Sequence, residues 1–77
     1  MIPVDSSQIH AIGYEALTQV LTIEFRQHNP SKPNSVYLYQ NVPPEIFNAF
    51  RAAPSIGSYF YKVIKPYPEK FPYQKIA

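Results

Sequence analysis

The sequence contains no cysteine, so it has neither a disulfide framework nor the thiolate chemistry of redox and nucleophilic sites. Charged residues make up only 16% of the chain and nine prolines interrupt it, which together exclude a coiled coil. Every apolar run is too short to span a membrane. No basic stretch followed by an apolar run opens the chain, so we expect no secretory signal and a cytoplasmic location.

Apolar and aromatic side chains are abundant enough for a small folded domain. Of the 77 residues 45% are hydrophobic, which excludes a disordered tail. Seven tyrosines and five phenylalanines are present, and each such ring buries roughly 150–250 Å² when enclosed. A chain this short needs most of these rings in its core. We expect one domain over residues 1–77, with a lead-in segment at 1–8 and a tail rich in proline and aromatic residues at 66–77.

Alternation of apolar and polar residues predicts three β-strands. The clearest signal is the alternation of Leu21, Ile23 and Phe25 with polar neighbours, which is typical of a strand with one buried face. In the first strand, Gly13 indicates a bulge or a close approach of another part of the chain. Short connections between consecutive strands favour an antiparallel meander. The predicted strands cover residues 9–14, 20–27 and 36–40, and a loop at 28–35 joins the last two.

Two short helices are predicted after the strands. Pro43-Pro44-Glu45 suits a helix start, because proline is tolerated in the first turn and a carboxylate favours the positive end of the helix dipole. Pro54 ends this helix, and Pro66 ends the second one. Apolar residues at three- and four-residue spacing mark the buried side of each helix. The sequence therefore predicts an α+β fold: a three-stranded antiparallel β-meander followed by two short helices packed on one face, with the tail returning along the sheet.

A series of short motifs along the chain resembles a known family. The motifs are Ser6-Ser7, Ile12-Gly13-Tyr14, Leu21, Ile23, Phe25, Tyr37-Leu38-Tyr39, Val42-Pro43, Ala53, Ser55, Gly57 and Phe60. Together they resemble the KTSC domain, which is named for the C-terminal extension of some lysyl-tRNA synthetases and also occurs as a stand-alone protein in bacteria and phages. The resemblance covers roughly residues 5 to 65. It implies a domain of unassigned function for which the synthetase context suggests RNA binding.

The chain departs from the family pattern in two places. Many members join the middle strands by a tight glycine turn, where this chain has a loop containing Pro30 and Pro33. Members often carry an asparagine after the aromatic residue of the second helix and an arginine near its end. This chain has Tyr61 and Lys65 at those positions. A role that depends on the asparagine or the arginine is therefore not carried over.

Catalytic and metal-binding signatures are missing from the sequence. The two histidines, His10 and His28, would need further ligands to hold a metal, and we interpret them as solvated or hydrogen-bonded side chains. The serines lack a base in any known nucleophile motif. We therefore expect no enzyme activity, no cofactor and no metal site.

Nucleic-acid binding is the first functional hypothesis, and its first support is the uneven distribution of charge along the chain. Residues 62–75 carry four lysines against one glutamate, a net charge of +3, whereas the chain as a whole has +2. Lys62, Lys65 and Lys70 are the candidate phosphate contacts in this basic end. The structural alternative is that Lys62 and Lys65 simply lie near a helix C-terminus, where cations are favourable.

The second part of this hypothesis is Tyr37 and Tyr39, which share one face of a strand. If Leu38 points into the core, both phenol rings lie on the open face and can stack on unpaired bases. The other register buries both tyrosines against the helices, with their hydroxyls at the rim. In so small a domain we favour burial of at least one of them.

The third part is the start of the second helix, where Ser55 and Gly57 are candidate phosphate contacts. The structural alternative is an ordinary serine cap, with Gly57 relieving a packing clash. The expected nucleic-acid ligand is RNA or another single strand.

Protein binding is the competing hypothesis. The tail contains Tyr67, Phe71 and Tyr73 among prolines, and such a segment can dock on a partner protein. Alternatively, these rings cover the core of the domain itself. We expect no membrane partner and a monomer or a weak homodimer.

Overall fold

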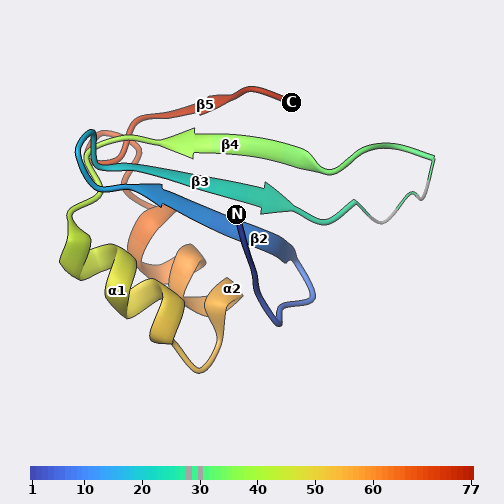
Figure 1. Ribbon diagram of the computed structural model, residues 1–77, viewed down its shortest axis with the longest axis horizontal. Coiled ribbons are helices and arrows are strands. Elements are labelled where there is room, and N and C mark those ends of the chain that lie inside the picture. Colours follow the sequence, from blue (N-terminus) through green and yellow to red (C-terminus); the bar gives the residue numbers. More distant parts are fainter. Residues whose placement is uncertain (28, 30) are drawn as a thin grey trace.

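One antiparallel sheet with helices on a single face makes up the computed structural model, which describes residues 1–27, 29 and 31–77 (Figure 1). Over these residues the five strands follow one another in chain order across the sheet. They are β1 (Ile2–Pro3), β2 (Ile9–Glu15), β3 (Val20–Phe25), β4 (Ser35–Tyr39) and β5 (Tyr73–Lys75). Between β4 and β5 come α1 (Pro44–Ala52), α2 (Ile56–Tyr59) and the π-helical turn η1 (Phe60–Ile64). None of the described helices is long and apolar enough to cross a membrane.

The predicted meander is present as β2, β3 and β4, but the expectation of a three-stranded sheet is wrong. Residues 1–8 are more than a lead-in, because β1 pairs with β2, and the tail adds β5 beside β4. With two and three residues, these strands are too short for an alternating pattern to show. Pro3 is compatible with β1 because an edge strand tolerates a residue that has no N–H group.

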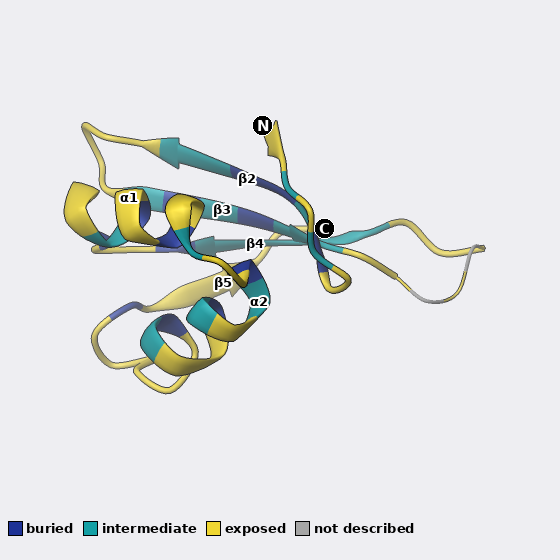
Figure 2. Cartoon of the chain, turned by 90° about the horizontal axis from the view of Figure 1, so that it is seen from below, coloured by how far each residue is buried: buried dark blue, intermediate teal, exposed yellow. Residues whose placement is uncertain are grey.

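The register between β3 and β4 decides which face carries the tyrosines. Leu21 lies opposite Tyr39 and Ile23 lies opposite Tyr37, so both tyrosines share the face of the buried β3 residues. Leu38 lies opposite Thr22 on the other face. Of the two placements considered above, the structure therefore has the one that turns the rings toward the helices. Figure 2 shows that buried positions gather in β2, β3 and the helices, whereas β5 is exposed.

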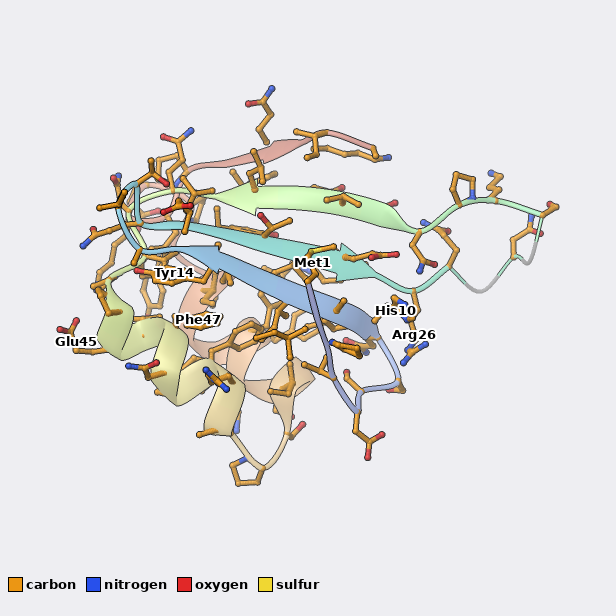
Figure 3. The ribbon with its side chains drawn as sticks, in the orientation of Figure 1. Met1, His10, Tyr14, Arg26, Glu45 and Phe47 are labelled. Atoms are coloured by element: carbon orange, nitrogen blue, oxygen red, sulfur yellow. The ribbon has the colours of Figure 1, made fainter. Side chains whose placement is uncertain are left out.

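The contact between α1 and β2 is an aromatic stack. The rings of Tyr14 and Phe47 lie 4.5 Å apart and nearly parallel, at 8°, and Figure 3 shows them together between the strand and the helix. The Tyr14 hydroxyl also donates a hydrogen bond to the Val42 carbonyl oxygen at 2.5 Å. Phe50, one turn farther along α1, is fully buried. These contacts place α1 across the sheet as its apolar stripe predicts.

The second predicted helix changes its hydrogen-bonding pattern midway. It begins as the short α2, and from Phe60 it continues as η1, in which the Lys65 N–H donates to the Phe60 carbonyl oxygen at 2.9 Å. This i→i+5 bond is the mark of a π-helix, a rare form that recurs at functional sites. An apolar pattern over nine residues does not distinguish the α from the π spacing, so the sequence predicted an ordinary helix.

The tail closes the core rather than hanging free. The Phe71 side chain is only 1% exposed. The Gln40 N–H donates to the Pro72 carbonyl oxygen at 2.8 Å, and the Val36 N–H donates to that of Ala77 at 3.0 Å. The interpretation that tail rings cover the domain's own core is therefore correct for Phe71.

Replacing Phe71 with alanine tests this role of the tail. Because the ring is buried, its loss should leave a cavity and lower the free energy of unfolding by about 3–5 kcal/mol. Tyr67→Ala is the matched control: this tail ring is 45% exposed, and its loss should change the stability by about 0.5 kcal/mol or less. Urea unfolding followed by circular dichroism measures both variants, and equal losses would contradict the structure.

Candidate functional site

An open cavity of about 430 Å³ lies where β4 and β5 meet η1. We call it the aromatic groove, because most of its lining consists of aromatic rings. Strand residues supply one wall, and η1 with the following turn supplies the other. The lining residues are Phe25, Ser35, Tyr37, Tyr39, Phe60, Tyr61, Ile64, Lys65, Pro68, Phe71 and Tyr73.

The strand wall of the aromatic groove is a cluster of three tyrosines. Strand pairing places Tyr73 opposite Tyr39, while Tyr37 and Tyr39 are neighbours on the same face of β4. The ring centroids are 5.7 Å apart for Tyr39 and Tyr73, 6.0 Å for Tyr37 and Tyr73, and 6.4 Å for Tyr37 and Tyr39. These separations are those of favourable aromatic pairs, so β5 completes a wall that β4 begins.

The opposite wall comes from the π-helical turn. The buried Phe60 ring lies edge-on to Tyr39 at 5.5 Å and to Phe25 at 5.3 Å. Tyr61 and Lys65 lie above it at the rim, and the Lys65 ammonium group is 4.6 Å from the centroid of the Tyr61 ring. This distance is within the range of a cation–π contact. The groove therefore has an apolar floor and a positive charge at its edge.

The tyrosines of the groove differ in how much of each ring meets solvent. Tyr73 is 58% exposed and Tyr61 is 43% exposed, whereas Tyr39 is only 6% exposed and Tyr37 is half-buried. The expectation that at least one of Tyr37 and Tyr39 is buried is therefore correct. Open ring faces are offered mainly by Tyr61 and Tyr73, and Tyr39 forms part of the floor.

Burial raises the pKa of the Tyr39 hydroxyl well above its usual value, and the nearby Tyr37, Tyr73 and Tyr61 phenols raise it further. The phenol therefore stays neutral at physiological pH and keeps its O–H as a hydrogen-bond donor.

The remaining candidate residues are divided between the groove and a second cavity. Tyr37, Tyr39 and Lys65 line the groove together, but Lys70 lines neither cavity, and its ammonium group lies 5.4 Å from the centroid of Phe71. The second cavity, of about 420 Å³, contains Ser55, Gly57 and Lys62. The three parts of the nucleic-acid hypothesis are therefore not gathered in one cavity.

We call this second cavity the serine cavity. It is lined by Asp5, Ser6, Ser7, Gln8, Pro54, Ser55, Ile56, Gly57, Ser58, Tyr61 and Lys62. Ser55 is a helix cap, since its hydroxyl oxygen accepts a hydrogen bond from the Ser58 N–H at 3.3 Å. A Cβ atom at Gly57 would lie 3.6 Å from the Gln8 side-chain oxygen, which is an ordinary van der Waals contact, so even the smallest side chain would cause no clash there.

Two groove residues, Tyr61 and Tyr73, were missing from the predicted site. The four-residue spacing of Tyr61 and Lys65 could have indicated that they share a helix face. For Tyr73 no local signal exists, because its place in the groove depends on pairing between β5 and the distant β4.

Among the residues that the structure describes, the acid, base and metal candidates are not gathered in one place. Arg26 joins β3 to the turn before β2: its Nε donates to the Ser6 carbonyl oxygen at 2.8 Å, and its Nη1 lies 3.2 Å from His10 Nδ1 (Figure 3). Within residues 1–27, 29 and 31–77, no three histidine or acidic side chains are grouped so that they could hold a metal ion. His28, the other metal candidate, lies outside the described residues, as does Pro30 of the predicted loop.

A comparison with known families supplies the identification. The family model of the KTSC domain matches residues 5–67. The chain belongs to the KTSC domain family. A crystal structure of a KTSC domain protein from Yersinia pestis superposes on it with a TM-score of 0.80 at 37% identity, covering 97% of this chain and 93% of that one. The family resemblance noted from the sequence is thereby confirmed.

Relatives of this KTSC domain occur both as small proteins and as parts of large ones. A protein from Tsukamurella paurometabola is 39% identical over 66 residues, which cover 86% of this chain and 90% of that protein. The lysine–tRNA ligase of Nostoc punctiforme is 38% identical over 73 residues, which cover 95% of this chain but only 11% of the ligase. The KTSC domain is therefore related to a small segment of that enzyme.

The buried Tyr39 hydroxyl predicts a change in stability at high pH. An unfolded tyrosine ionises near pH 10, at about its ordinary pKa, whereas the raised pKa of Tyr39 keeps its proton on in the folded state. Above about pH 10 the unfolded state therefore binds fewer protons, and the free energy of unfolding should fall as the pH rises.

In the Tyr39→Phe variant the free energy of unfolding should fall less steeply with pH. Tyr67→Phe, which changes an exposed tyrosine, should leave the slope of the wild type unchanged. Urea unfolding at several pH values between 9 and 11 measures the slopes. Identical slopes in wild type and Tyr39→Phe would show that Tyr39 is not the group responsible.

Proposed function

We propose that this KTSC domain is a non-catalytic module that binds single-stranded RNA by stacking bases in the aromatic groove. The observation that carries the proposal is the convergence of Tyr37, Tyr61 and Tyr73 with Lys65 around one open cavity. Each base has a flat π-face, and stacking on an aromatic side chain contributes about 1–3 kcal/mol per base.

The dimensions of the groove support this ligand. Its volume of about 430 Å³ lies within the roughly 300–1,000 Å³ typical of small-ligand pockets. The buried floor of Phe60 and Phe71 excludes water beneath an inserted ring. The Tyr39 hydroxyl adds a neutral donor that can meet a base carbonyl oxygen. A planar heterocycle can pack on the apolar floor and accept a hydrogen bond from the Tyr39 hydroxyl at the same time.

Charge supports a nucleic acid over a neutral aromatic ligand. Lys65 lies at the edge of the groove, and Lys62 and Lys70 lie nearby in the sequence. A single strand that places its base in the groove carries a phosphate on each side, and these lysines can neutralise it. Related segments occur in lysine–tRNA ligases, enzymes whose substrate is an RNA.

Protein docking through the tail receives less support. Phe71 is buried and β5 is paired with β4, so a large part of this segment is already used within the domain. The exposed Tyr73 ring belongs to the groove wall. Deleting residues 67–77 would consequently damage both the fold and the groove, and it would not isolate a docking element.

Removing the exposed ring of Tyr73 tests the groove. Tyr73→Ala should weaken binding of a short single-stranded RNA by about tenfold, because one stacking platform of about 1–3 kcal/mol is lost. Tyr67→Ala removes another exposed ring, one that does not line the groove, and should leave the affinity unchanged. Fluorescence anisotropy with a labelled oligonucleotide gives both constants. Absence of binding at high micromolar protein would refute the proposed function.

The salt dependence tests the lysines. If Lys62, Lys65 and Lys70 each meet one phosphate, the slope of log affinity against log salt concentration should be about −2 for a single strand. Lys65→Ala should reduce this slope by about 0.7, and Lys32→Ala, in the connection between β3 and β4, should not change it. A flat salt response of the wild-type protein would contradict phosphate binding at the groove edge.

A further inference from the structure

The aromatic groove and the serine cavity are neighbours that share one residue. Tyr61 lines both of them, with Lys65 on the groove side and Lys62 on the cavity side. Tyr61, which is 43% exposed, therefore lies at the boundary between the two spaces. A ligand seated on this ring in the groove therefore has its next chemical group beside the serine cavity.

The two spaces differ in chemistry. Rings and aliphatic carbons line the groove, whereas the serine cavity is lined mainly by hydroxyl, carboxylate and amide groups. Two of its serines are engaged with the backbone: Ser6 Oγ accepts from the Ile9 N–H at 3.2 Å, and Ser55 Oγ accepts from the Ser58 N–H at 3.3 Å. The side chains of Asp5, Ser7 and Ser58 make no hydrogen bond among the described residues, so their side-chain oxygens are available to a ligand.

The carboxylate of Asp5 limits which chemical groups can bind in the serine cavity. Its carboxylate only accepts hydrogen bonds and repels a phosphate at close range. A sugar hydroxyl, in contrast, donates to a carboxylate and can also accept from the hydroxyl of Ser7 or Ser58. The cavity therefore suits a neutral polyol, and Lys62 at its edge suits the anionic group attached to that polyol.

We infer that the serine cavity holds the ribose of the nucleotide whose base stacks at Tyr61, and that Asp5 and Ser7 bind its 2′-hydroxyl. This inference rests on the proposed function of the aromatic groove. The 2′-hydroxyl is the group by which a protein distinguishes RNA from DNA. A DNA strand lacks this hydroxyl and therefore cannot form the hydrogen bonds to Asp5 and Ser7. The domain should therefore prefer RNA to DNA.

The test compares RNA and DNA oligonucleotides of equal length and matched sequence, with uracil in both. The wild-type domain should bind the RNA about tenfold more tightly, as expected for a hydrogen bond to a charged group. Asp5→Ala and Ser7→Ala change exposed side chains, so both variants should fold. Each should reduce the ratio of RNA to DNA affinity toward one. Glu45→Ala, which removes an exposed carboxylate on α1, should keep the ratio of the wild type.

The ratio is the informative quantity because removing a negative charge strengthens the binding of both strands alike. A second measurement replaces one ribose at a time by deoxyribose along the RNA. One position should account for most of the preference in wild type and for none of it in Asp5→Ala.

The possible failures are distinct. If neither strand binds, the proposed function of the groove is wrong and this inference is wrong with it. If both strands bind equally to the wild-type domain, base stacking in the groove stands and the ribose assignment is overturned. If RNA is preferred but Asp5→Ala and Ser7→Ala keep the full preference, the serine cavity is not where the ribose is bound.

Discussion

The contact of Phe60 with the sheet is the interaction on which both the core and the groove depend. Its ring is 2% exposed and lies edge-on to Phe25 of β3 and Tyr39 of β4. The backbone of the same residue opens the π-helical turn, which carries Tyr61 and Lys65 to the groove edge. Loss of this ring would therefore weaken the contact between η1 and the sheet, and it would remove part of the floor of the groove.

A small domain with many aromatic residues can use the same side chains for stability and for recognition. The groove is a continuation of the core at the side where β5 and η1 do not fully close over it. Floor residues such as Tyr39 and Phe71 contribute mainly burial, whereas Tyr61 and Tyr73 at the rim keep open faces. A substitution at the rim should therefore affect ligand binding with little effect on folding, whereas a substitution on the floor should affect both.

Much of the fold could be predicted from local patterns, and the site could be predicted only in part. The alternation around Ile23 and the prolines bordering α1 correctly gave the middle strands and the first helix. β1 was missed because it exists only through pairing with a longer neighbour, whereas the expected return of the tail along the sheet is present as β5. Of the predicted site residues, Tyr37, Tyr39 and Lys65 meet in the groove, whereas Ser55, Gly57 and Lys62 lie in a separate cavity and Lys70 lies in neither.

By itself, the sequence determined which segments are extended, which are helical and where the basic charge lies, because propensity, proline geometry and apolar spacing act between near neighbours. Only the tertiary structure decided which face of β4 carries Tyr37, which strand pairs with Tyr73, and that Tyr61 stands between two cavities. These features follow from strand register and from the packing of distant rings. The register of the strands is selected by the total apolar surface that the domain buries. This area depends on the whole fold, so it cannot be derived from any short stretch of the sequence.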